Sequence, residues 1–401
     1  MLNVIDKFIF AGATLLIVFL LNASGNGSLA TTYFIPLLFI WVFIQRGGLN
    51  NSLFRAPMVY FLCFVFLSFF SVLYSIDSLA SLTTQLKFTA IVLFSLGVYL
   101  YSINKVVNIK LVYAVNIIVF VLLVWYFKYL NVGTYFDETS RLEDTVISAN
   151  TYGYYIFNGI FAFFILTAMV KSDFVKLFLF AFFVYLAYQS LFIILFSASR
   201  GAFLIWIFSL IGNLFIILFT YFKSTFIKVI VFFLLFIFFS MSTSYFSSIT
   251  SEDIYLFERF ASMEDNETPR EYHVKKALEI GSENFLFGVG SGGYAIVPKS
   301  IEQGSFSHNT FTEIFANFGI IGLSVYIFFW SSLMKMWRKA FKVSNNEKTV
   351  LYIVCFYFII FNLYSTLYVV YLSNIFMHLL FVVCAHIVTI INRSEKLSYA
   401  E

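Results

Sequence analysis

The sequence predicts an all-α polytopic membrane protein with about twelve transmembrane helices. Hydrophobic residues make up 61% of its 401 residues and charged residues only 11%, against about 25% charged in soluble domains. The mean hydropathy is +0.90, and phenylalanine alone supplies 56 residues. A water-soluble fold of this size could not bury so much apolar surface. The apolar runs are long and do not alternate residue by residue, which indicates helices and not a β-barrel.

Twelve apolar runs are long enough, with their flanking residues, to cross a membrane. A transmembrane helix needs about 20 mainly apolar residues. The first run is interpreted as an anchor that stays in the membrane, not as a cleaved signal. The predicted spans cover residues 8–21, 29–44, 57–75, 88–103, 109–129, 152–170, 174–197, 202–222, 226–245, 313–334, 349–368 and 371–391.

The distribution of charge predicts the orientation of these spans. With the N-terminus in the cytoplasm, the cytoplasmic segments hold 16 of the 25 basic residues and five of the 21 acidic ones. The net charge is then +11 inside and −7 outside, counted from the same residues. Cytoplasmic segments of membrane proteins carry an excess of lysine and arginine. We therefore expect a multi-pass protein of the bacterial inner membrane with both termini in the cytoplasm.

Residues 1–401 are expected to form a single integral membrane domain with two outer segments long enough to build a site. Residues 130–151 form the smaller periplasmic loop and residues 246–310 the large one. The amphipathic stretch at 271–280 predicts that the large loop is partly helical.

Four arginines lie on the outer side, against the usual charge bias: Arg141, Arg200, Arg259 and Arg270. Arg200 sits in a tight connection between two apolar spans, which keeps its guanidinium at the membrane surface. A guanidinium stays charged and can bind a phosphate through two parallel hydrogen bonds. The alternatives are that Arg200 contacts lipid headgroups and that Arg270 is a solvated charge paired with a neighbouring glutamate.

His308 is the candidate general base. It precedes an apolar helix, and Thr310 and Glu313 have the spacing of a capping box, which predicts a helix start there. The positive end of that helix suits an anionic ligand and keeps the imidazole neutral, as a base requires. The alternative is a surface histidine at a loop-to-helix junction. His273, also in the large loop, is expected to be solvated, and two histidines are too few for a zinc site.

Gly288, Gly290 and Gly293 match the pattern G-x-G-x-x-G, but no βαβ unit surrounds them. We expect a tight turn there, or a close approach of the backbone to a ligand.

The same residues resemble motifs of the O-antigen polymerase/ligase superfamily. His308 and Asn309, followed after nine residues by Gly319 and then Gly322, resemble its H-N-x9-G-x-x-G motif. Arg200 ahead of an apolar span resembles that family's arginine before a transmembrane helix.

Two further segments resemble the family. Arg270 and Gly281, with ten residues between them and the glycine cluster behind, resemble its R-x10-G large-loop motif. The segment around Asn150 resembles the asparagine-containing start of a middle span. The motifs cover roughly residues 148–325, and their order and sidedness agree with the family.

The resemblance implies a GT-C-like fold and a metal-independent glycosyltransferase without a cofactor. Arg200 and Arg270 would stabilise a diphosphate leaving group, and His308 would take the proton of the attacking hydroxyl. The implied partners are an undecaprenyl-diphosphate-linked oligosaccharide, membrane lipid, a chain-length regulator and a flippase, and no nucleic acid. Candidate substrate-binding residues are Asn309, Asn150, Arg141, Gly288, Gly290 and Tyr294.

Two activities share these motifs. A polymerase joins lipid-linked repeat units into longer chains, and a ligase moves the finished chain from undecaprenyl diphosphate to lipid A-core. We favour the polymerase, because the glycine cluster and the segment around Asn150 are more typical of it. A non-enzymatic polysaccharide transporter or flippase is the third alternative, although few charged residues lie inside the spans and no internal repeat is present.

Overall fold

The computed structural model describes residues 2–22, 29–45, 55–130, 149–196, 199–220, 229, 233, 269–296, 306–344, 346–369 and 374–398. Within these ranges the chain is helical, with short connections and no strand, so the predicted all-α class is confirmed. The chain divides into two compact units. The first comprises Met1–Gly27, Ile109–Asp265 and Asn345–Ile360, and the second Ser28–Asn108, Asn266–Ser344 and Phe361–Glu401.

Among the described residues, eight helices are long and apolar enough to cross a membrane, and two shorter apolar helices accompany them. The predicted span at 226–245 lies almost wholly outside the described residues. Each of the other predicted spans coincides with a helix. The chain is therefore a polytopic membrane protein.

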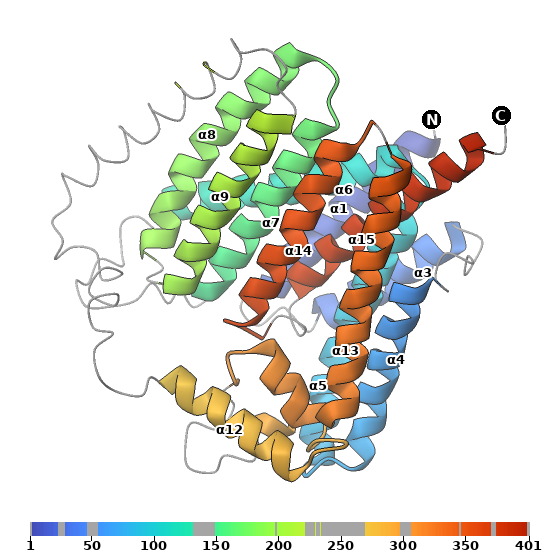
Figure 1. Cartoon of the computed structure of the whole chain (residues 1–401), viewed down its shortest axis with the longest axis vertical. Coiled ribbons are helices and arrows are strands. Elements are labelled where there is room, and N and C mark those ends of the chain that lie inside the picture. Colours follow the sequence, from blue (N-terminus) through green and yellow to red (C-terminus); the bar gives the residue numbers. More distant parts are fainter. Residues whose placement is uncertain are drawn as a thin grey trace, which may run out of the picture. The chain divides into compact units, whose positions relative to one another are not determined.

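The first unit is built on α7 (Ala149–Ala168), α8 (Asp173–Phe196) and α9 (Arg200–Thr220), which pack against one another (Figure 1). It also contains α1 (Leu2–Asn22), most of α6 (Val106–Leu130) and the first part of α14 (Lys348–Ser365).

Aromatic rings fill the interior of this unit. The Phe157 and Phe161 rings lie 5.4 and 5.1 Å from the ring of Tyr357, measured between centroids. Gly159 makes room for Phe120, because a Cβ atom there would lie 2.5 Å from that side chain. Helices in lipid associate through such close packing, since lipid offers no hydrophobic force between them.

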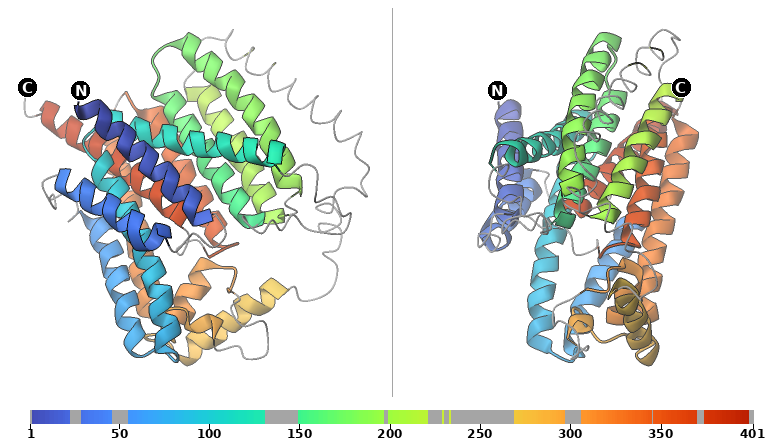
Figure 2. Two further views of the ribbon diagram at one scale, coloured as in Figure 1. Left: turned by 180° about the vertical axis from the view of Figure 1, so that it is seen from behind. Right: turned by 90° about the vertical axis from the view of Figure 1, so that its left-hand side faces the viewer.

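The second unit contains α3 (Ile35–Gln45) with the π-helical turn η1 (Ala30–Phe34) before it, and α4 (Ala56–Phe70), α5 (Ser78–Ser102), α12 (Pro269–Glu283), α13 (Thr310–Val343) and α15 (Asn374–Ser398). α5 packs against α15 and α3, whereas α13 packs against α4, α12 and α15 (Figure 2). α15 is largely enclosed, because most of the residues between Met377 and Glu395 are buried.

α5 begins ten residues before the span predicted at 88–103. The carboxylate of Asp77 accepts hydrogen bonds from the backbone N–H groups of Leu79 and Ala80, at 3.0 and 2.9 Å. An aspartate at this position satisfies donors that an uncapped helix would leave open. The residues between Asp77 and the apolar run at 88–103 are therefore helical, even though they are largely polar.

The large loop is partly helical, as predicted. Its helix α12 includes the amphipathic stretch at 271–280, and the short 3-10 helix η5 (Gly293–Ala295) follows. The described parts of the loop share a small apolar core with the start of α13. This core consists of Ala277, Ile280, Val289, Tyr294 and Ala316.

Candidate active site

α13 is broken at Gly319, which has φ 63° and ψ −164°. The sequence predicted an uninterrupted apolar helix here. The structure instead has a short first part, which ends at Phe318, and a long second part (Figure 1). This backbone conformation is open almost only to glycine. The short first part carries the residues of the H-N motif at its start.

The glycine cluster of the large loop is paired with the break in α13. Two carbonyl groups of α13, which would otherwise accept hydrogen bonds within the helix, accept them from the loop. Two N–H groups beyond the break donate to loop carbonyls in return. The four bonds are Val289 N to Ala316 O (2.9 Å), Gly290 N to Asn317 O (2.8 Å), Ile320 N to Phe285 O (2.8 Å) and Ile321 N to Leu286 O (3.4 Å).

The glycine cluster was expected to form a tight turn or to bring the backbone close to a ligand. In the structure its backbone lies close to the backbone of α13. A Cβ atom on Gly288 would lie 2.4 Å from the carbonyl carbon of Asn317, and Gly290 has φ 91°. The N–H of Gly288 donates to Asn284 at 2.8 Å, and that of Gly290 donates to α13. Both glycines thus have a structural role, and their contact with substrate stays a prediction.

The first part of α13 is capped by Asn309. Its side-chain oxygen accepts hydrogen bonds from the backbone N–H groups of Phe311 and Thr312, at 2.9 and 3.2 Å. The predicted helix start is confirmed, but the capping box is wrong. Thr310 is the first helical residue, and Glu313 accepts a bond from the backbone N–H of Ser307 at 2.7 Å.

His308 is half-buried and has φ 58°, a left-handed conformation that few residues other than glycine adopt. The residues on both sides hold it there. The buried hydroxyl of Ser307 donates to the carbonyl oxygen of Asn309 at 2.8 Å, while Asn309 caps the helix. Strain of this kind, costing about 1–3 kcal/mol, tends to occur at functional sites.

His273 lies beside His308, which the sequence did not predict. Its side chain is buried, with 6% of its surface exposed, so the expected solvated histidine is wrong. The two imidazole rings have their centroids 5.8 Å apart, at an angle of 64°. His273 Nδ1 lies 3.0 Å from the hydroxyl oxygen of Tyr294.

Arg270 is on the same face of α12 as His273, three residues away. Its guanidinium lies over the ring of Tyr368, with Cζ 5.2 Å from the centroid, and donates a hydrogen bond of 3.3 Å to the Tyr368 hydroxyl. The carbonyl oxygen of Tyr368 accepts a bond of 2.7 Å from the hydroxyl of Thr310. Tyr368 therefore connects Arg270 to the start of α13.

The sequence signal for His273 was available in principle. The stretch at 271–280 is amphipathic, and a residue three positions after Arg270 shares its helix face. For Tyr368 no signal was available, because it is distant in the sequence and follows α14 directly. The structure thus brings together Arg270, His273, Tyr294, His308 and Asn309 in the second unit.

The other predicted site residues belong to the first unit. Arg200 is the first residue of α9, after Ser199, whose hydroxyl oxygen accepts a bond from the Ala202 N–H at 3.3 Å. The tight connection predicted before this helix is confirmed, since α8 ends at Phe196. Asn150 is the second residue of α7. Arg141 lies outside the described residues.

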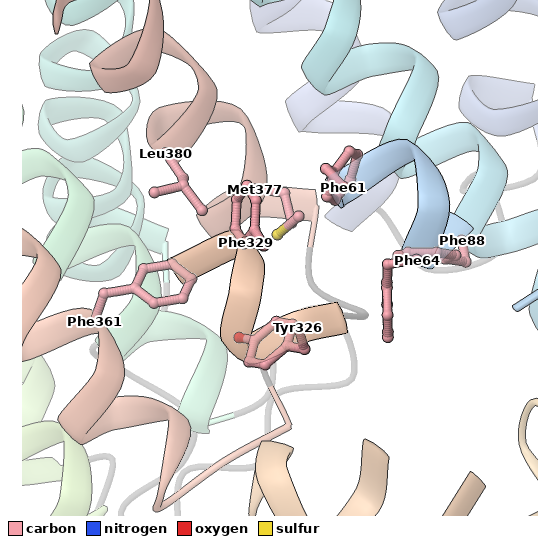
Figure 3. Close-up of a pocket in the computed structure, with 8 residues that line it drawn as sticks. All are labelled: Phe61, Phe64, Phe88, Tyr326, Phe329, Phe361, Met377 and Leu380. Atoms are coloured by element: carbon pink, nitrogen blue, oxygen red, sulfur yellow. The ribbon is translucent and has the colours of Figure 1, made fainter. Parts of the chain in front are cut away.

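Aromatic side chains line a small hollow in the second unit (Figure 3). Its volume is about 10 Å³, room for about one water molecule. A polyprenyl chain does not fit in such a space. The lining residues are Phe61, Phe64, Phe88, Tyr326, Phe329, Phe361, Met377 and Leu380.

The fold, together with the group formed by Arg270, His273 and His308, defines a class of protein. It is a polytopic membrane protein whose large loop presents a guanidinium and two imidazoles at a helix start. A model of the family described as O-antigen ligase matches residues 181–327, which is less than half of the chain. This region includes Arg200, Arg270, His273 and His308. A search of curated proteins found no match. The family domain supports a role in the biosynthesis of O-antigen or a related polysaccharide.

Proposed function

We propose that this chain is an O-antigen, or surface polysaccharide, polymerase. It joins repeat units carried on undecaprenyl diphosphate at the periplasmic face of the inner membrane. The observation that carries the proposal is the grouping of Arg270, His273 and His308 at the start of α13, within the matched family domain. These groups supply a cation for a diphosphate and a base for a hydroxyl.

His308 is the proposed general base. A sugar hydroxyl of the acceptor attacks the anomeric carbon of the donor, and its proton passes to the imidazole of His308. The bond between that carbon and the diphosphate oxygen breaks, and undecaprenyl diphosphate leaves with the electron pair. The left-handed backbone at His308 and the cap at Asn309 hold the imidazole at the helix start. A positioned base contributes about 10²–10⁴-fold to such a rate.

Arg270 is the proposed partner of the leaving group. The hydroxyl and ring of Tyr368 restrict its guanidinium, so less freedom is lost when it binds phosphate oxygens. Charge that develops on the diphosphate is stabilised by this cation without a metal ion. Arg200 is a second candidate for the same diphosphate, on the strength of its motif.

An O-antigen ligase is the second candidate, and the description of the matched family favours it. The chemistry at the donor is the same, and only the acceptor differs. Purified protein is incubated with lipid-linked repeat units, with and without lipid A-core. A polymerase lengthens the lipid-linked glycan in both mixtures, whereas a ligase requires lipid A-core and labels it. If neither product forms while the repeat units cross a vesicle membrane, the chain is a transporter and the proposal is wrong.

A further inference from the structure

The large loop exposes three consecutive apolar side chains shortly after α12. Phe285, Leu286 and Phe287 are 53%, 57% and 48% exposed. We refer to these three residues as the loop tip. Surfaces that face water rarely carry such a run, because exposed large apolar side chains are unfavourable there unless they bind something. The loop tip therefore indicates an apolar partner.

The backbone of the loop tip has all three of its carbonyl oxygens bonded within the protein. In chain order they accept hydrogen bonds from the Ile320 N–H at 2.8 Å, the Ile321 N–H at 3.4 Å and the Tyr74 hydroxyl at 2.8 Å. A loop in water does not need such donors, since water supplies them. Backbone groups in hydrocarbon must find their partners within the protein. The loop tip meets this requirement at its carbonyl groups.

The loop tip lies level with one end of the span formed by α4. The span Ala56–Leu73 has 18 residues, which at about 1.5 Å per residue cover roughly 27 Å. This length is close to the hydrocarbon thickness of about 30 Å. Arg55 precedes the span at one membrane surface, and Tyr74 follows it at the other, where tyrosine is enriched. Because the Tyr74 hydroxyl is bonded to Phe287, the loop tip lies at this second surface.

The loop tip also continues the lipid-facing side of α4. Large exposed apolar residues recur on this helix every three or four positions, the spacing of one helix face. The ring of Tyr74 lies 6.2 Å from that of Phe70 and 6.1 Å from that of Phe287, measured between centroids. Apolar side chains thus follow one another from the helix to the loop tip. The exposed apolar residues of α4 and the turn after it are Val59, Leu62, Phe66, Phe69, Phe70 and Leu73.

We infer that the loop tip inserts its three side chains among the acyl chains of the leaflet at this end of α4. The charge distribution predicts that this is the outer leaflet. Apolar side chains of interfacial segments reach about 5–10 Å into the boundary between headgroups and acyl chains. The loop tip is bonded to the backbone just beyond Gly319, so its insertion fixes the depth of the break in α13 as well. The inference does not depend on the proposed activity.

A cysteine at the loop tip measures whether water reaches it. Leu286→Cys is compared with Ser282→Cys, an exposed position near the end of α12. Both are placed in lipid nanodiscs and treated with a charged maleimide, and the wild-type protein gives the background of the native cysteines. We expect Leu286→Cys to react at least about tenfold more slowly, because a thiol in apolar surroundings forms less thiolate. Equal rates in the two variants would overturn the inference.

Tryptophan quenching by lipid identifies what covers the loop tip. Leu286→Trp and Ser282→Trp are placed in nanodiscs whose acyl chains carry bromine, and the signal of the five native tryptophans is subtracted. We expect bromine to remove most of the fluorescence added at position 286 and little of that added at 282. The Leu286 side chain is more than half exposed, so its replacement leaves the packed interior intact. Slow labelling of Leu286→Cys without quenching of Leu286→Trp would mean that a second copy of the chain covers the loop tip, and would also overturn the inference.

Discussion

Gly288 and Gly319 flank the same crossing of two backbone segments, where the large loop passes the break in α13. A Cβ atom on Gly288 would lie 2.5 Å from the carbonyl oxygen of Ala316, and one on Gly319 would lie 2.3 Å from that of Leu286. The two glycines belong to separate sequence motifs, and the structure unites them in one feature. The first part of α13 therefore ends at this crossing. It begins at the cap formed by Asn309, directly after His308.

Gly319→Ala should lower the stability of the protein. The backbone there has φ 63° and ψ −164°, which costs a residue with a Cβ atom about 1–3 kcal/mol, and the Cβ atom would overlap Leu286. The midpoint of thermal unfolding in detergent measures the effect. Gly12→Ala is the matched control, because nothing lies within 4 Å of a Cβ atom at Gly12.

Gly12→Ala should leave the midpoint unchanged or raise it, since alanine favours a helix interior by about 1 kcal/mol over glycine. If Gly319→Ala is as stable as Gly12→Ala, the pairing between the loop and the break does not hold the site.

Tyr368 should act on activity through Arg270. Tyr368→Phe keeps the ring beneath the guanidinium but removes the hydroxyl that accepts its hydrogen bond. Tyr368→Leu removes both. We expect Tyr368→Phe to lose less than about tenfold in turnover, and Tyr368→Leu to lose more.

Arg270→Lys tests the same site directly. Lysine keeps the charge but cannot bind two phosphate oxygens through a planar fork, so most activity should be lost. Wild-type turnover in Arg270→Lys would show that this guanidinium does not hold the leaving group. Expression levels in membranes are compared for all three variants.

The amphipathic and apolar patterns predicted most of the helices, because side-chain periodicity and length determine them locally. The break in α13 could not be predicted, since a glycine within an apolar run is also tolerated in an unbroken helix. The conformation of Gly319 depends on loop residues far along the chain. The same holds for His273, whose burial results from Tyr294 and the start of α13. The start of α5 at Asp77 was within reach, because an aspartate ahead of a helix is a common cap.

Glu313 should stabilise the segment that carries His308 by accepting the backbone N–H of Ser307. Glu313→Gln keeps an oxygen that can accept this bond, so its effect on stability should be small. Glu313→Ala leaves a buried N–H without a partner, at a cost of about 1–3 kcal/mol. Thermal unfolding of the two variants is compared. Equal midpoints would mean that this bond does not support the segment.

The orientation in the membrane follows from the charge distribution and can be tested separately. A reporter fused after Lys342 should be active in the cytoplasm, and one fused after Glu283 should be active in the periplasm. Lys342 lies in the last turn of α13, and Glu283 is the last residue of α12. The opposite result at either point would reverse the side on which the proposed site lies.

The central claim is that His308 takes the proton in a metal-free glycosyl transfer. His308→Asn is the variant of choice, because asparagine tolerates the left-handed backbone at this position and alanine does so less well. Purified protein is given lipid-linked repeat units in the presence of EDTA, and polymer is quantified. We predict that wild-type protein forms polymer and that His308→Asn is slower by about 10²–10⁴-fold while it unfolds at the wild-type temperature. Wild-type rates in His308→Asn, or loss of wild-type activity in EDTA, would contradict the account.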